Sequence, residues 1–231
     1  TVFLAASISK TVTATAIMQL WEQGKIDLNE DISTYLPFQV RHPDYPDIPI
    51  TVRMLLTHTA GITSTLWKPF LYFSVLHYPK EWYEQYLTPG NSFYHADNWN
   101  EYPPGEGIYY TSLVYDLLSF IVERITGMPY HDYCKQYIFE PLHMHNTSLR
   151  LTEIDFDQLS TFYGYLFGVY FRIPPYEIHI DGSAGMYTTV EDLCHFLKMH
   201  MQDGHYQGTQ LLQPETIKQM HTVQFPDLPS Y

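Results

Sequence analysis

The chain has few cysteines, few basic residues and no long uninterrupted apolar run. Its two cysteines, Cys134 and Cys194, stand in neither a Cys-x-x-Cys nor another metal-ligand spacing, which argues against a disulfide scaffold and against a zinc-ribbon site. The apolar stretches around residues 67–76 and 162–171 are too short for a bilayer and are interrupted by Lys, Pro or Gly. The sequence therefore predicts no transmembrane helix.

Basic residues are outnumbered by acidic ones. The 12 Lys and Arg residues stand against 25 Asp and Glu residues, which gives a net charge of −13. Such a charge repels phosphate backbones and anionic lipid surfaces, so nucleic acid is not expected as a partner. The content of hydrophobic residues is 45% in a chain of 231 residues. This is enough for a substantial core, in one large domain or in two small lobes.

The apolar pattern predicts a helix near the start of the chain. In residues 7–23, Val12, Ala16, Ile17 and Leu20 recur at helical spacing, and Gly24 follows where a C-terminal cap belongs. Further helices are expected from their caps and apolar faces. They are residues 51–58 with Thr51 as N-cap and Gly61 ending the unit, residues 112–126 with Gly127 as the stop, a helix opened by Pro129, a helix capped by Thr189, and a last helix begun by Pro214.

The helix after Thr189 shows two further patterns. Asp192 stands three residues after Thr189, as in a capping box, and Leu193, Phe196, Leu197 and Met201 are expected to form its buried face.

Turns and loops occupy much of the remaining chain. Residues 25–37 suit a short turn-rich segment, and residues 89–107, rich in Asn, Asp, Pro, Gly and aromatics, predict a long loop that is a candidate part of a functional site. The run 161–173 has mixed periodicity, so strand, packed loop and distorted helix all remain possible there. Its aromatic side chains are expected in the core, with an acyl pocket as the alternative.

The most informative short stretch is "SISK" at residues 7–10. Residues three apart share a helix face, so Ser7 can meet Lys10, whereas Ser9 points away from it. A serine hydroxyl becomes a nucleophile when a neighbouring base takes its proton. The N-terminal end of a helix also offers free N–H groups, so the Ser7 amide could bind an oxyanion. The alternative is that Ser7 is only an N-cap and that Lys10 is solvated.

Five later stretches give this pair a context. They are "ITVRMLLTHTAGI" at 50–62, "PPGEGIYYTSLVYDLLSFIVERITGMPY" at 103–130, "YIFEPLHMHNTS" at 137–148, "GSAGMYTTVEDLCHFLKMH" at 182–200 and "GTQLLQPETIKQM" at 208–220. In this order they resemble the serine β-lactamase-like family, in its branch of class C β-lactamases, penicillin-binding proteins and esterases. The resemblance implies an α+β, transpeptidase-like fold, of which this chain is mainly the helical lobe with the flanking sheet strands largely missing.

The resemblance also implies roles for particular residues. In that family the Ser-x-x-Lys serine is acylated, its lysine assists proton transfer, and the tyrosine of a Tyr-x-Asn motif acts as general base or acid. These roles fall on Ser7, Lys10 and Tyr110, the last being preferred to Tyr109 by its spacing from the Pro-Gly pair. A phenol beside an ammonium has its anion favoured. The implied enzyme is a serine hydrolase with no metal and no organic cofactor, acting on an ester or amide carbonyl of a small molecule or peptide, and periplasmic or secreted.

Two departures from the family pattern bear on the function. Ser112 stands where the family usually has Asn, which would hold a substrate amide, and the shorter hydroxyl favours ester hydrolysis or acyl transfer over hydrolysis of antibiotic amides. The third family motif, Lys-Thr-Gly or His-x-Gly, is expected beyond Tyr231, since "HIDG" at 179–182 lies before its proper place. Residues 1–231 are therefore expected to be the central part of one larger domain.

A rival from another functional class follows from the same departures. It is a catalytically inactive, penicillin-binding-like protein that binds peptidoglycan or acyl ligands.

Three histidines that could suggest a base or a metal site are not expected to have such a role. His58, in the Thr-His-Thr-Ala-Gly stretch, is expected to be a buried histidine with satisfied partners, and His143 and His145 have no partner cluster that would favour a metal site.

Overall fold

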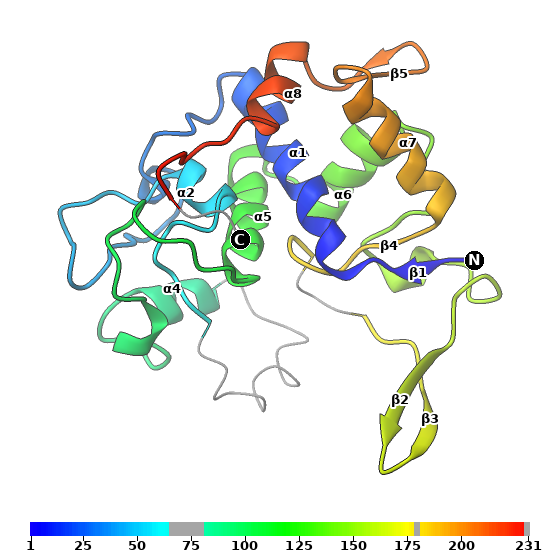
Figure 1. Ribbon diagram of the computed structural model, residues 1–231, viewed down its shortest axis with the longest axis horizontal. Coiled ribbons are helices and arrows are strands. Elements are labelled where there is room, and N and C mark those ends of the chain that lie inside the picture. Colours follow the sequence, from blue (N-terminus) through cyan, green and yellow to red (C-terminus); the bar gives the residue numbers. More distant parts are fainter. Residues whose placement is uncertain (65–80, 178–180, 229–231) are drawn as a thin grey trace.

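A central helix organises the protein. The computed structural model describes residues 1–64, 81–177 and 181–228, and in it α1 (Ser9–Glu22) runs between the other helices, after a 3-10 turn η1 (Ala6–Ile8) (Figure 1). The predicted apolar face of α1 is buried, which confirms that expectation. Burial extends further, to the polar side chains Thr13, Thr15 and Gln19, so neighbours cover most sides of this helix.

The helices predicted from caps are confirmed. Helix α5 (Leu113–Thr126) packs beside α1 and ends at Gly127, whose φ of +69° is left-handed. Helix α2 (Val52–Leu56) is capped by the Thr51 side chain, which accepts from the N–H of Met54. The predicted α6 (Tyr130–Cys134) after Pro129, α7 (Val190–Met201), and α8 (Pro214–Met220) with Pro214 in its first turn are also present. The described residues further include α4 (Glu81–Leu87), a π-helical turn η4 (Lys135–Phe139) and a 3-10 turn η5 (Leu151–Glu153), which were not predicted.

Helix α7 is capped as predicted, but only two of the four residues expected on its buried face lie there. The Thr189 hydroxyl caps the helix by accepting from the N–H of Asp192. Phe196 is buried and Leu193 is partly buried against the core, whereas Leu197 and Met201 are 56% and 75% exposed.

The physical reason lies in the carboxylate of Asp192. Instead of completing a capping box, it accepts from the N–H of Asn146 and from the hydroxyl of Thr147, at 2.8 and 2.7 Å. These bonds turn the Asp192, Phe196 and Met199 side of α7 inward.

The strands form three small antiparallel sheets. Strand β1 (Phe3–Leu4) pairs with β4 (Tyr187–Thr188), β2 (Phe162–Leu166) with β3 (Val169–Ile173), and β5 (His205–Tyr206) with β6 (Thr209–Gln210). Residues 25–37 and 89–107 contain the short turns η2 (Ile32–Thr34) and η3 (Ala96–Asn98) and isolated bridges at Asp31 and Trp99, so the expected turns and long loop are confirmed. The described chain is mainly helical with little sheet, as expected.

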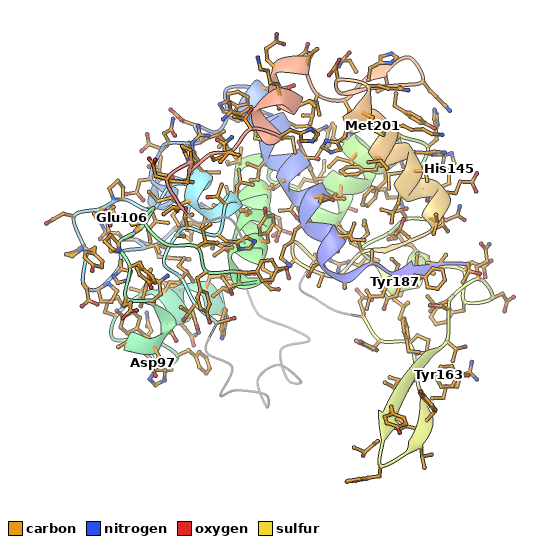
Figure 2. All side chains as sticks on the ribbon, viewed as in Figure 1. Asp97, Glu106, His145, Tyr163, Tyr187 and Met201 are labelled. Carbon is orange, nitrogen blue, oxygen red and sulfur yellow. The ribbon has the colours of Figure 1, made fainter. Side chains whose placement is uncertain are left out.

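The aromatic run 161–173 forms the β2–β3 hairpin, and the expectation that its side chains belong to the core is wrong for most of them. The hairpin projects away from the helices (Figure 1), and Tyr163 is one of the aromatic side chains that it carries (Figure 2). Tyr163, Tyr165 and Tyr170 are 63%, 63% and 72% exposed, and Phe167 at the turn is 94% exposed. At the base of the hairpin Phe162 is partly buried against the cluster of Val2, Leu151, Ile154 and Tyr187, so the expectation is met in part for this residue. Further out, the aromatic side chains on both faces of the ribbon are exposed.

No helix among the described residues has the length and apolar character needed to cross a membrane. Residues 67–76, one of the two apolar stretches noted in the sequence, lie outside the described residues.

Candidate active site

The site begins where the chain enters α1. Ser7 lies in the η1 turn and is exposed. The residue before it, Ala6, has a φ of +47°, a left-handed conformation that costs a residue with a Cβ about 1–2 kcal/mol. Strain of this kind recurs beside functional groups because surrounding contacts hold it in place. The first N–H groups of a helical turn have no partner within it, so the Ser7 amide stands where an oxyanion could be bound.

Lys10 lies one turn further along the chain and points back to Ser7. Its Nζ is 3.2 Å from Ser7 Oγ, 3.4 Å from Ser112 Oγ and 2.9 Å from the carbonyl oxygen of Ser183. The residue is only 6% exposed. Buried ammonium groups need partners of this kind, and the alternative of a solvated Lys10 is wrong.

Tyr110 faces Ser7 from the loop before α5. Its phenol donates to Ser7 Oγ at 3.0 Å, and Lys10 Nζ lies 5.0 Å from the centre of its ring. Partial burial opposes ionisation of the phenol, but hydrogen bonding to Lys10 and Ser7 and the charge of Lys10 together lower the pKa of Tyr110 below its usual value. One hydroxyl is thus shared by an ammonium and an acidified phenol.

The neighbouring serine and tyrosine lie differently. Ser9 is buried, donates to the carbonyl oxygen of Ala6 at 2.7 Å and accepts from the N–H of Met186 at 3.0 Å. Its hydroxyl therefore ties η1 to the chain before β4. Tyr109 is bound through its backbone, since its N–H donates to the carbonyl oxygen of His58. The geometry brings together Ser7, Lys10, Tyr110 and Ser112, the four residues singled out in the sequence.

His58 is half-buried and supports the site without reaching Ser7. Its Nδ1 lies 3.4 Å from the N–H of Thr111, and its ring centre is 4.5 Å from that of Tyr110 and 5.1 Å from that of Tyr115. Burial and the charge of Lys10 lower the pKa of His58 to about 4, so the ring is neutral at pH 7. Its Nδ1 has a hydrogen-bond partner, in line with the expectation, but the ring is half-buried rather than buried, and its packing against Tyr110 was not predicted.

Two residues next to Lys10 were not predicted from the sequence to have a role. They are Ser183, whose carbonyl oxygen receives Lys10 Nζ, and Asp116, which is 4% exposed and accepts from Ser183 Oγ at 3.0 Å. A signal was present for Asp116, because it is an acidic residue within the apolar stretch of α5. Ser183 carried no comparable signal.

The other candidate residues do not join the site. The His143 and His145 ring centres are 5.9 Å apart, and within residues 1–64, 81–177 and 181–228 no group of three or more His, Cys, Asp or Glu side chains could hold a metal ion. Both cysteines are free thiols. Part of the "HIDG" stretch, residues 179 and 180, lies outside the described residues.

Comparisons with known proteins extend over nearly the whole chain. The model of the family described as Beta-lactamase matches residues 1–229. Protein flp of Staphylococcus aureus (strain NCTC 8325 / PS 47) is 28% identical over 205 residues, which cover 85% of this chain and 38% of that protein. Penicillin-binding protein 4* of Bacillus subtilis (strain 168) is 27% identical over 216 residues, covering 87% and 45%. The chain thus spans less than half the length of these curated relatives.

A solved structure has the same fold. The D-stereospecific amidohydrolase from Streptomyces sp. superposes with a TM-score of 0.73 and 27% identity, covering 98% of this chain and 67% of that one.

Proposed function

The chain belongs to the Beta-lactamase family, and we propose that it is a serine hydrolase that cleaves an ester or amide through an acyl-enzyme on Ser7. The observation that carries the proposal is the position of Ser7 Oγ, within hydrogen-bonding distance of both Lys10 Nζ and Tyr110 Oη, at 3.2 and 3.0 Å. A nucleophile, a proton acceptor and a cation that lowers the acceptor's pKa are the groups that acyl transfer requires.

In the proposed first half-reaction, the Tyr110 phenolate takes the proton of Ser7 as Oγ bonds to the substrate carbonyl carbon. The carbonyl electron pair moves to oxygen, and the Ser7 N–H helps to stabilise that oxyanion. When the intermediate collapses, the bond to the leaving alcohol or amine breaks, and Tyr110 returns its proton to the leaving group. Lys10 stays an ammonium throughout and stabilises the phenolate each time it forms.

In the second half-reaction, water replaces the leaving group. Tyr110 takes a proton from the water as its oxygen attacks the acyl carbon. The ester bond to Ser7 then breaks, and Ser7 Oγ recovers the proton from Tyr110. The products are a carboxylic acid and the regenerated serine.

Ser112 bears on the choice between esters and amides. Its hydroxyl lies 3.4 Å from Lys10 Nζ, where it offers one short donor and acceptor instead of the wider amide of an Asn. This supports esters as the better substrates. The similarity to a D-stereospecific amidohydrolase supports amides of D-amino acids as the class to test against them.

The experiment compares turnover of p-nitrophenyl esters with that of D-amino-acid p-nitroanilides. We expect hydrolysis of both classes, with the larger kcat/KM for the esters, and we expect Ser112→Asn to shift the ratio towards the anilides by about tenfold, the worth of one hydrogen bond. Hydrolysis that persists in Ser7→Ala would contradict the mechanism. An absence of turnover in the unaltered protein would favour the inactive, ligand-binding alternative.

A further inference from the structure

Residues 181–186 form a wall of the site and are bonded to α1 along its first turns. Lys10 Nζ donates to the carbonyl oxygen of Ser183 at 2.9 Å, and the Thr13 hydroxyl donates to that of Gly182 at 2.6 Å. The N–H of Met186 donates to Ser9 Oγ at 3.0 Å. The carbonyl oxygen that receives Lys10 is therefore part of a segment that α1 holds at three points.

A carboxyl group lies behind this wall. Asp116 projects from α5, is 4% exposed, and accepts from Ser183 Oγ at 3.0 Å through Oδ2. Its Oδ1 is buried and has no hydrogen-bond partner among the described residues. Burying a carboxyl with half of its acceptors unused is costly, and the adjacent α5 residues Leu117 and Leu118 are apolar and fully buried. The packing of α5 therefore gives no reason for an acidic residue at position 116.

Asp116 also interacts electrostatically with the site. Burial raises the pKa of Asp116 to about 8, while the Ser183 hydrogen bond and the charge of Lys10 act in the opposite direction. The other titratable group that acts on it is Asp181, in the same wall segment, whose charge favours the protonated form and which is itself 3.0 Å from Arg150. The carboxyl therefore changes its charge close to neutral pH, two hydrogen bonds away from Lys10.

We propose that Asp116 is a positioning residue of the Ser7–Lys10 pair: it fixes Ser183 and, when ionised, retains Lys10 as an ammonium. The connection runs from Asp116 Oδ2 to Ser183 Oγ at 3.0 Å, and from the Ser183 carbonyl oxygen to Lys10 Nζ at 2.9 Å and on to Ser7 Oγ at 3.2 Å. Asp116 touches no reacting atom. The inference rests on the proposed function, because its effect on rate acts through Lys10 and hence through the Tyr110 phenolate.

The kinetic test compares Asp116→Asn with the unaltered protein between pH 6 and pH 9, using a p-nitrophenyl ester. Asn keeps an acceptor for Ser183 but cannot ionise, so the ratio of unaltered to variant kcat should rise at least threefold across this range, with KM little changed. Ser119→Ala is the matched control. Ser119 is a buried serine on the same helix whose hydroxyl donates to the Asp116 backbone carbonyl, and we expect this variant to keep a pH-independent ratio.

A second measurement does not depend on catalysis. In protein labelled at lysine Cε, the Lys10 NMR signal, assigned by its loss in Lys10→Arg, should move between pH 6 and pH 9 in the unaltered protein as Asp116 changes charge, and should not move in this range in Asp116→Asn. The same signal behaviour in both proteins together with a pH-independent rate ratio would overturn the inference. If the unaltered protein does not hydrolyse esters, the proposed function fails, and the NMR titration still decides whether Asp116 acts on Lys10.

Discussion

Three side chains carry the proposed chemistry of the site, and they differ in exposure. Lys10 is buried among oxygen atoms, whereas Tyr110 is 58% exposed and Ser7 faces solvent beside it. Because the buried Lys10 ammonium is held in one position, its charge acts steadily on the Tyr110 phenol and lowers the pKa of that phenol. The exposed pair remains accessible to a substrate.

Removal of the Tyr110 hydroxyl should damage catalysis and spare the fold. In Tyr110→Phe, Ser7 loses its proton acceptor, and we expect kcat for ester hydrolysis to fall about 10²–10⁴-fold. The thermal midpoint should change little because the side chain is largely exposed. Tyr109→Phe is the control, since Tyr109 is 43% exposed and its hydroxyl has no part in the mechanism. Equal losses in the two variants would contradict the role of Tyr110.

His58 should make stability depend on pH in a defined window. Its pKa is lowered to about 4 from 6.5, so the unfolded chain binds the proton more tightly, and the contribution of the neutral ring, present above pH 6.5, is lost as the pH falls towards 4. The loss should be on the order of 2 kcal/mol. His58→Asn should remove it. Asn tolerates the φ of +58° found there.

The measurement is urea unfolding of the two proteins at pH 7 and pH 4.5. The fall in the free energy of unfolding between these values should be smaller in His58→Asn. An identical fall in both proteins would show that His58 is not held neutral.

The helices and the projecting hairpin differ in how they pack against the rest of the protein. The helices pack around α1, while β2 and β3 pair only with each other among the described residues (Figure 1). The two-residue turn between them consists of Phe167 and Gly168, with φ values of +49° and +85°. Two left-handed residues are typical of a type I′ hairpin turn, which favours Asn-Gly.

Phe167→Asn should therefore not destabilise the protein. The replaced ring is 94% exposed, and Asn adopts a positive φ more readily than Phe. We expect the free energy of unfolding to stay within about 0.5 kcal/mol of its original value. Phe139→Ala is the comparison, because Phe139 is 2% exposed and its truncation should cost about 3–5 kcal/mol. A loss of similar size in both variants would show that the hairpin is covered.

Element positions were predictable from the sequence because local signals determine them. Thr51 and Thr189 cap their helices through hydrogen bonds to residues three positions further along the chain. Gly127 ends α5 because it adopts a left-handed φ. The Ser7–Lys10 pairing is equally local. The exposure of the hairpin aromatics and the inward face of α7 were not predictable, because they depend on what packs against those segments.

At the scale of the whole molecule, the site depends on contacts between distant parts of the chain. Residues 182 and 183 bond to Thr13 and Lys10 on α1, about 170 positions earlier, and Ser183 also bonds to Asp116 on α5. No local pattern encodes such contacts, which is why Ser183 was missed and why Asp116, although an acid within an apolar stretch of α5, could not be assigned a partner.

Gly182 shows how closely these parts meet. A Cβ at Gly182 would lie 2.3 Å from the carbonyl oxygen of Tyr115 and 2.8 Å from the Ser119 side chain. Gly182→Ala should therefore push residues 181–186 away from α5 and lower the free energy of unfolding by about 3 kcal/mol. The rate of ester hydrolysis should fall as well. In Gly127→Ala the Cβ meets nothing within 4 Å, and only the positive φ costs about 1 kcal/mol. Denaturant unfolding of both variants makes the comparison, and equal effects would contradict the close packing.

Covalent labelling shows whether Ser7 is the nucleophile. The protein is incubated with a fluorophosphonate, and the adduct is measured by intact mass and located by peptide mapping. We expect one adduct, on Ser7, which disappears in Ser7→Ala, persists in Ser9→Ala and forms more slowly in Tyr110→Phe. An adduct on another residue, or labelling that survives Ser7→Ala, would rule out Ser7 as the nucleophile.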